Sequence, residues 1–258
     1  MGLARVSGRT EIWYDYMVLM ALLPTASALS QALEDIRGRV RRAAERAKTN
    51  PNDIDILAVT KTLPPERVLE AWDLGLWQFG ESRVQESERK IDSLRGRFPE
   101  DRRPRWHLIG HLQTNKVRKA LEIFDCVQSV DSLKLVELLD KECGRRAQPV
   151  SCLIEVKISE EPAKQGLPLE NLPAFLEQAT RFPFVRIEGL MGVAPLFDRP
   201  EQTRPYFRQL RKLFDRHRAF FQSDQPILSM GMSADFEVAV EEGATMVRLG
   251  TALFGKRP

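Results

Sequence analysis

The regular alternation of short apolar runs with amphipathic segments constrains the fold of this chain more than any other feature. Between residues 56 and 250, strand-forming runs recur, and helical spacing of apolar residues fills the segments between them. The eight predicted strands cover residues 56–61, 77–81, 105–110, 126–130, 151–158, 185–193, 227–230 and 246–250. The seven predicted helices between them cover residues 65–74, 82–95, 113–122, 132–146, 169–181, 201–221 and 234–242.

This order of elements predicts an α/β fold, a single (β/α)8 TIM barrel. Strands apolar enough to be covered on both faces, each followed by a helix, favour a closed parallel barrel, with a doubly wound open sheet as the alternative. An extra N-terminal helix is predicted before the first strand, because its apolar residues share one helical face; they are Leu29, Leu33, Ile36 and Val40. No linker divides the rest of the chain, so we expect one barrel domain over residues 27–258.

The N-terminal segment is treated separately from the barrel. Residues 17–28, MVLMALLPTASA, have the apolar core and small residues of a signal peptide, but Glu11 and Asp15 upstream do not fit that pattern. The apolar run is shorter than the ~20 residues that a membrane span requires. We expect residues 1–26 to be a disordered lead or a product of an upstream start site, and we expect no membrane association.

Charge and cysteine content narrow the class of protein. The 39 basic and 36 acidic residues give a net charge of +3, which argues against a protein devoted to nucleic acid. Cys126, Cys143 and Cys152 have neither the spacing of a disulfide framework nor that of a metal site. A cytoplasmic protein is therefore expected.

Polar residues gather where the predicted strands end, and barrel chemistry is found at the carboxyl ends of strands. The first strand, in LAVTKT, ends on Lys61. A partly desolvated lysine there can attack a carbonyl carbon, although an ordinary polar strand end is the simpler interpretation. The strings SMGMS and RLGT follow strands seven and eight, where barrels bind phosphate through backbone N–H groups.

Together these features predict a site for a phosphorylated aldehyde. We expect Lys61 on one side of the barrel mouth and the phosphate cradle on the opposite side, as pyridoxal phosphate would require. Arg248 is the third feature: if it points into the mouth, its charge would disfavour protonation of a pyridine nitrogen. A salt bridge at the barrel end is the alternative role for Arg248.

Five strings of the chain carry a family resemblance: LAVTKT, FGESRVQE, WHLIGHLQTNK, SVDSLKL and LSMGMSADFEVAVEEGATMVRLGTALFG. Over residues 29–255 the sequence resembles the pyridoxal phosphate homeostasis proteins, single barrels similar to the N-terminal domain of alanine racemase. The resemblance implies pyridoxal 5'-phosphate (PLP) held as a Schiff base on Lys61 and an arginine, Arg248, facing the pyridine nitrogen. It further implies phosphate contacts at Ser229, Gly250 and Thr251, with Met230 and Ser233 as weaker candidates. Ser82 stands where the family usually has asparagine.

The resemblance implies a carrier that buffers PLP and delivers it to PLP-requiring apoenzymes, and we expect a monomer. Alanine racemase uses a tyrosine from a second domain as its second base, whereas the tyrosines here, Tyr14, Tyr16 and Tyr206, are poorly placed. No catalytic residue is therefore predicted. The alternatives are a weak amino-acid racemase or other PLP enzyme, an aldolase using Lys157 or Lys61, and an interaction module at 201–221.

A metal site is not expected. His107 and His111 lie four residues apart, but on a strand-to-loop junction this spacing does not give the shared face that a helix would provide.

Overall fold

The computed structural model describes residues 27–159, 161 and 165–256. The strands are β1 (Asp55–Val59), β2 (Gln78–Glu81), β3 (Arg105–Leu108), β4 (Cys126–Val130), β5 (Val150–Lys157), β6 (Leu167–Pro168), β7 (Val185–Gly192), β8 (Ile227–Met232) and β9 (Met246–Leu249). The α-helices are α2 (Ala28–Ala47), α3 (Pro65–Asp73), α4 (Val84–Ser93), α5 (Val117–Ile123), α6 (Leu133–Arg146), α7 (Leu172–Ala179), α8 (Arg204–Arg216), α9 (Phe236–Glu241) and α10 (Thr251–Phe254). The expectation for residues 1–26 lies outside the described residues.

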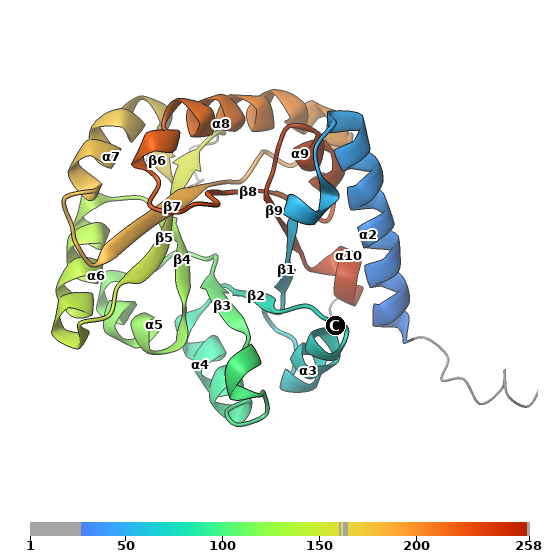
Figure 1. Cartoon of the computed structure of the whole chain (residues 1–258), viewed down its shortest axis with the longest axis horizontal. Coiled ribbons are helices and arrows are strands. Elements are labelled where there is room, and N and C mark those ends of the chain that lie inside the picture. The colour runs from blue at the N-terminus through green and yellow to red at the C-terminus, as the bar shows by residue number, and fades with distance from the viewer. Residues whose placement is uncertain (1–26, 160, 162–164, 257–258) are drawn as a thin grey trace, which may run out of the picture.

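The strands close into a parallel barrel. Each strand pairs with its neighbour in the order β1, β2, β3, β4, β5, β7, β8, β9, and β9 pairs again with β1, with Ala58 opposite Leu249. The helices surround this ring (Figure 1). The prediction of a (β/α)8 barrel is confirmed, and the open doubly wound sheet is wrong, because the first and last strands share a ladder.

The predicted N-terminal helix is α2, which covers the part of the barrel where the ring closes (Figure 1). The Ser27 side chain caps the start of this helix by accepting a hydrogen bond from the Ser30 N–H at 3.1 Å. The apolar face predicted from the sequence is buried, and it packs against α9 and α10. Arg39 adds an ion pair to Glu237 of α9 at 2.7 Å.

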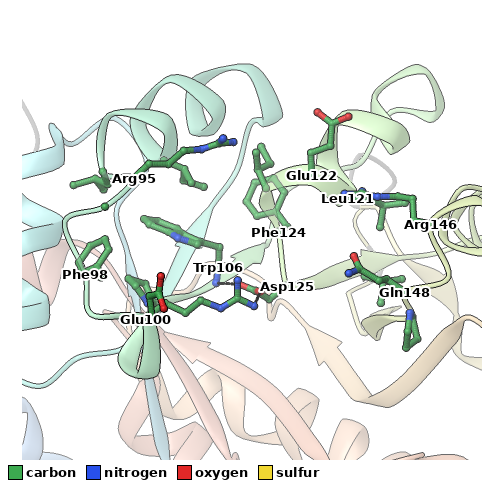
Figure 2. A pocket seen from close by; sticks show the side chains of 18 of the residues that line it. Arg95, Phe98, Glu100, Trp106, Leu121, Glu122, Phe124, Asp125, Arg146 and Gln148 are labelled. Carbon is green, nitrogen blue, oxygen red and sulfur yellow. Dashed lines mark hydrogen bonds and ion pairs between the residues drawn. The ribbon is translucent and has the colours of Figure 1, made fainter.

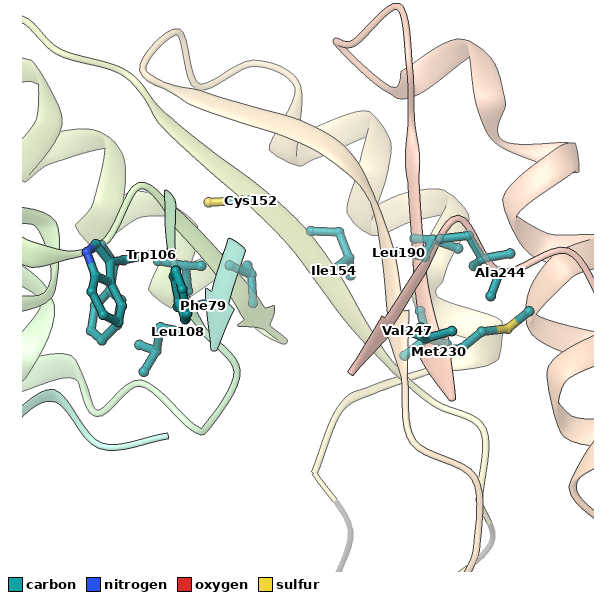
Figure 3. Close-up of a cluster of buried hydrophobic side chains, with 14 of the residues drawn as sticks. Phe79, Trp106, Leu108, Cys152, Ile154, Leu190, Met230, Ala244 and Val247 are labelled. Carbon is teal, nitrogen blue, oxygen red and sulfur yellow. The ribbon is translucent and has the colours of Figure 1, made fainter. Parts of the chain in front are cut away.

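Alternate residues of each strand face opposite sides of the barrel wall. On the last two strands, Met230 and Val247 belong to the apolar layer beneath the helices (Figure 3). Their neighbours Ser229 and Arg248 point the other way and hydrogen-bond to each other inside the barrel. The helix-facing layer is thus apolar, whereas the interior of the barrel carries polar groups.

Several features differ from the sequence-based expectation. The segment predicted as one helix over 201–221 is a 3-10 turn (Pro200–Thr203), α8 and a second 3-10 turn (Arg218–Phe220). The two-residue strand β6, which pairs with the end of β5, and the short helix α10 were not predicted. Among the described residues, no helix is both long and apolar enough to cross a membrane.

Candidate functional site at the carboxyl end of the barrel

Lys61 lies in a tight turn just beyond the end of β1, where it is partly exposed. The turn is closed by a hydrogen bond of 3.0 Å from the Leu63 N–H to the Thr60 carbonyl. Thr62 has a φ of +63°, which is unusual for a β-branched residue, and its N–H donates to the Glu86 carboxylate of α4. The residue after Lys61 thus has a strained conformation that is held by a neighbouring helix.

A buried polar cluster lies behind this turn, on the helix side of the barrel. The ammonium of Lys90, from α4, lies 2.7 Å from the Glu81 carboxylate and also donates to the Thr60 carbonyl. The Thr60 hydroxyl donates to the same Glu81 oxygen at 2.7 Å. Burial raises the pKa of Glu81, and the Lys90 charge opposes that rise. This cluster was not predicted from the sequence. The signal that could have revealed it is Lys90, a charged residue on the buried face of α4.

The loops after β8 and β9 meet at the start of α10. The Ser233 hydroxyl accepts a hydrogen bond of 3.0 Å from the Ala252 N–H, so Ser233 lies beside Gly250 and Thr251. Gly231 has a φ of +88°, and a Cβ there would lie 2.4 Å from the Ala239 Cβ, so this close turn requires glycine. The structure therefore brings together three of the predicted phosphate-site residues.

The expected placement of Lys61 opposite this loop cluster is wrong. Because β1 and β9 are neighbours in the closed barrel, Lys61 and Gly250 follow adjacent strands. The first and last strands of a closed barrel lie side by side, although they are far apart in the chain. The lysine and the α10 loop thus lie at the same part of the barrel mouth.

Arg248 is buried inside the barrel, with only 4% of its surface exposed. Its guanidinium donates to the Ser229 hydroxyl at 2.8 Å and to the Gly192 carbonyl at 2.9 Å. It forms no ion pair with any carboxylate of the described residues, so the salt-bridge interpretation is wrong. Burial lowers the pKa of Arg248 to about 10, and Glu155 and Asp235 act against that shift. A buried cation whose hydrogen-bond partners are all neutral is unusual and can accommodate an electron-rich ligand.

Three of the sequence candidates, Ser229, Met230 and Ser82, lie away from the α10 loop. Ser229 is fully buried, and its hydroxyl donates to the Gln128 side chain at 2.8 Å while accepting from Arg248. The Met230 side chain is fully buried in the helix-facing apolar layer (Figure 3). Ser82 follows β2, and its carbonyl lies against the loop glycine Gly110.

The end of β5 adds two charged residues to the mouth. Glu155 and Lys157 line a cavity of about 240 Å³, together with residues that follow β5 and β7. Burial raises the pKa of Glu155 to about 7, and Asp131 adds to the rise while Arg248 opposes it. A carboxyl group that titrates near neutrality therefore lies close to the buried guanidinium.

The histidines do not form a metal site. His107 is fully buried inside the barrel and contacts Gln128, whereas the His111 Nδ1 lies 3.9 Å from the Asp131 carboxylate. Over the part of the chain that the structure describes, no three potential ligands gather to hold a metal ion.

A second hollow lies at the other end of the barrel. Figure 2 shows this groove of about 760 Å³, lined by Trp106, Phe98 and Phe124 near the amino ends of β3 and β4. None of the predicted site residues lines it. Size alone therefore does not identify the functional site, because Lys61, Arg248 and the other predicted site residues lie at the opposite end of the barrel.

The closed barrel, the lysine after its first strand and the buried arginine on its last define a barrel of the alanine racemase N-terminal type. A family model described as alanine racemase, N-terminal domain, matches residues 32–258. Alanine racemase from Clostridium difficile superposes with a TM-score of 0.66 over 86% of this chain and 60% of that one, at 14% identity, which speaks for the fold alone.

More similar sequences give the particular family. A pyridoxal phosphate homeostasis protein of Aquifex aeolicus is 42% identical over 89% of this chain and 96% of its own length. The Escherichia coli K12 protein of the same name is 36% identical over 89% of this chain and 97% of its own. PipY of Synechococcus elongatus, solved with PLP bound, is 38% identical with a TM-score of 0.71, over 84% of this chain and 100% of that chain. The chain belongs to the pyridoxal phosphate homeostasis protein family.

Proposed function

We propose that this protein binds PLP at the carboxyl end of its barrel, buffers the cofactor and delivers it to PLP-requiring apoenzymes. The observation that carries the proposal is the adjacency of β1 and β9, which brings Lys61 beside the loop of Gly250 and Thr251. An amine and an anion-binding loop within reach of each other are what a phosphorylated aldehyde needs. The solved PLP complex of PipY supports the same ligand.

The residues at the mouth fit the functional groups of PLP. Bound PLP supplies a reactive aldehyde, which the Lys61 amine can hold as a Schiff base. Ser233, Gly250 and Thr251 offer a hydroxyl and backbone groups for the phosphate. Arg248 uses two of its five N–H donors in protein hydrogen bonds, and its fixed charge disfavours protonation of a nearby pyridine nitrogen.

The surroundings of Tyr206 and the proposed position of Arg248 favour a carrier over an enzyme. Tyr206 is partly buried, and its ring lies 5.8 Å from that of Phe197, so it packs in the apolar layer instead of serving as a second base. Tyr14 and Tyr16 lie outside the described residues. An arginine beside the pyridine nitrogen also weakens the ring as an electron sink, which opposes aminotransferase-type chemistry.

The rival hypothesis of an interaction module at residues 201–221 is not favoured. The apolar stripe of α8, Phe207, Leu210 and Phe214, is buried against the barrel. Arg204 pairs with Glu242 of the chain itself at 2.9 Å, so this arginine is already engaged.

The remaining parts of the proposal concern the state of the protein in the cell. We propose a monomer, formed by one barrel domain over residues 27–258. We also propose a cytoplasmic location, which is supported by the three cysteines: all are buried, and none forms a disulfide within the described part of the chain.

The test is an absorbance spectrum of the purified protein between about 300 and 450 nm with added PLP, before and after borohydride reduction. We expect a band that bleaches on reduction, and a pyridoxyl mass fixed on the peptide that carries Lys61. Lys61→Ala should lose the fixed mass and stay folded, because a strand-end lysine contributes little packing. Lys157→Ala is the control and should keep it.

Three outcomes would redirect the proposal. A pyridoxyl mass fixed on Lys157 in the wild-type protein would move the Schiff-base lysine from Lys61 to the end of β5, whereas a protein that shows no visible band with PLP would favour the aldolase-like alternative. Turnover of an amino acid by the loaded protein, abolished by Lys61→Ala, would favour the weak racemase.

A further inference from the structure

We infer that Gln128, supported by His107, is a positioning residue that holds Arg248 in its orientation through Ser229. The effect on a bound ligand rests on the proposed function, because Arg248 is the residue that would face the pyridine ring. Gln128 did not stand out in the sequence, and His107 was considered there only as a metal ligand.

The four side chains form one hydrogen-bonded chain across the barrel interior, from β3 to β9. His107 Nδ1 lies 2.9 Å from Gln128 Nε2, and Gln128 Oε1 lies 2.8 Å from the Ser229 hydroxyl. The Ser229 hydroxyl in turn lies 2.8 Å from the Arg248 guanidinium. His107, Gln128 and Ser229 are fully buried, so water does not compete for these bonds.

The chemistry of the groups fixes the direction of each bond. A guanidinium can only donate, so the Ser229 oxygen accepts from Arg248 and its own proton goes to the Gln128 carbonyl. The Gln128 amide nitrogen must then donate to His107 Nδ1, which carries no proton. A neutral imidazole protonated at Nε2 follows, and burial lowers the pKa of His107 to about 3 in agreement with this. Within the described part of the chain, the His107 Nε2 has no hydrogen-bond partner.

Gln128 is the one described side chain that accepts the proton of the Ser229 hydroxyl. If Gln128 loses its carbonyl, the Ser229 proton loses its acceptor, and the hydroxyl can rotate away from the geometry that receives Arg248. The guanidinium then keeps one of its two hydrogen-bonded protein partners, the Gly192 carbonyl. We expect Arg248 to become more mobile in the apoprotein, before any ligand is present.

Gln78 provides a matched control for this idea. It is also a buried glutamine, 2% exposed, and its side-chain oxygen has no hydrogen-bond partner among the described residues. It neighbours Asp55 near the amino end of β1, away from Arg248. Gln128→Met and Gln78→Met both replace a buried amide with a methionine of similar length, so a general loss of packing would affect both variants alike.

The first measurement needs no ligand. The Arg248 Nε–H resonance of 15N-labelled apoprotein, assigned by its loss in Arg248→Met, reports how often the guanidinium is released. We expect its hydrogen exchange to be about fivefold faster in Gln128→Met, since one hydrogen bond contributes about 1 kcal/mol, and unchanged in Gln78→Met. Equal exchange in wild type and Gln128→Met would overturn the inference, whether or not the protein binds PLP.

The second measurement tests the consequence at the cofactor. With PLP bound, Gln128→Met should shift the absorbance maximum and its pH profile, whereas Gln78→Met should not. In an Arg248→Met background the additional effect of Gln128→Met should vanish, because residues that act through one partner are not additive. A shift of the same size in both backgrounds would show that Gln128 does not act through Arg248. A wild-type protein that takes up no PLP would instead refute the proposed function and leave the exchange result standing.

Discussion

The ammonium of Lys90 and the carboxylate of Glu81 lie 2.7 Å apart, both buried, directly behind the turn that carries Lys61. This ion pair also holds the carbonyl and the hydroxyl of Thr60, the residue before Lys61. The end of β1 is thereby tied to α4 instead of moving freely in solvent. The pair thereby anchors the residue that precedes Lys61.

Replacement of Lys90 tests the strength of this attachment. Lys90→Met leaves the Glu81 carboxylate buried without its cation, and we expect a loss of about 3 kcal/mol in the free energy of unfolding by urea titration. The folded state already raises the pKa of Glu81, and removal of Lys90 raises it further. A carboxyl group whose pKa is raised in the folded state lowers the stability of the fold as pH rises, because ionisation is easier in the unfolded chain. The loss caused by Lys90→Met should therefore be larger at about pH 8 than at about pH 5.

The control for Lys90→Met is an exposed ion pair of the same helix region. Arg95 lies 2.9 Å from Asp92, but it is 70% exposed. Arg95→Met should change the free energy of unfolding by no more than about 0.5 kcal/mol. Equal effects of the two substitutions would mean that the buried pair does not anchor the turn.

The depressed pKa of His107 predicts a pH dependence of stability. The unfolded chain binds a proton at His107 below a pKa of 6.5, but the folded state binds it only near pH 3, so this residue destabilises the fold as pH falls. From about pH 7.5 to about pH 5.5, its contribution should fall by about 1.4 kcal/mol. Glu155, with its pKa raised to about 7, acts in the opposite direction over the same range.

Comparison of His107→Asn with wild type isolates the histidine from Glu155. We expect the variant to be less stable at about pH 7.5, and the gap in unfolding free energy to narrow by about 1.4 kcal/mol at about pH 5.5. Parallel pH profiles of the two proteins would show that His107 is not held neutral.

Two glycine substitutions should have opposite effects. A Cβ at Gly110 would lie 2.3 Å from the Ser82 carbonyl, so Gly110→Ala must push apart the loops after β2 and β3. We expect a loss of about 2 kcal/mol and weaker PLP binding. Gly38 is in the middle of α2, with Arg42 Nη1 the nearest atom at 3.4 Å, and Gly38→Ala should stabilise by about 0.5–1 kcal/mol. Thermal unfolding of both variants gives the comparison.

Ser82→Asn tests whether the family's usual asparagine would strengthen the site. The longer amide should reach the cofactor, and one additional hydrogen bond would tighten PLP binding about fivefold, measured by absorbance titration. Ser82→Ala is the matched control and should leave the affinity almost unchanged. An equal affinity of all three proteins would place residue 82 outside the site.

The sequence by itself determined the order of the eight barrel strands and of the main helices between them. The buried face of α2 could be predicted because side-chain periodicity is a local property of the backbone. The strings around Lys61 and Arg248 also carried the family resemblance. These features depend on residues that are close together in the chain.

Only the tertiary structure decided which distant residues meet. Closure of the barrel puts Lys61 and Gly250 after adjacent strands, whereas the sequence predicted them on opposite sides of the mouth. The hydroxyls of Ser229 and Ser233, four residues apart, face different partners, because one points into the barrel and the other lies beside α10. The contact of Gln128 with Ser229 joins residues 101 positions apart. Such contacts depend on strand register and closure, which no local pattern encodes.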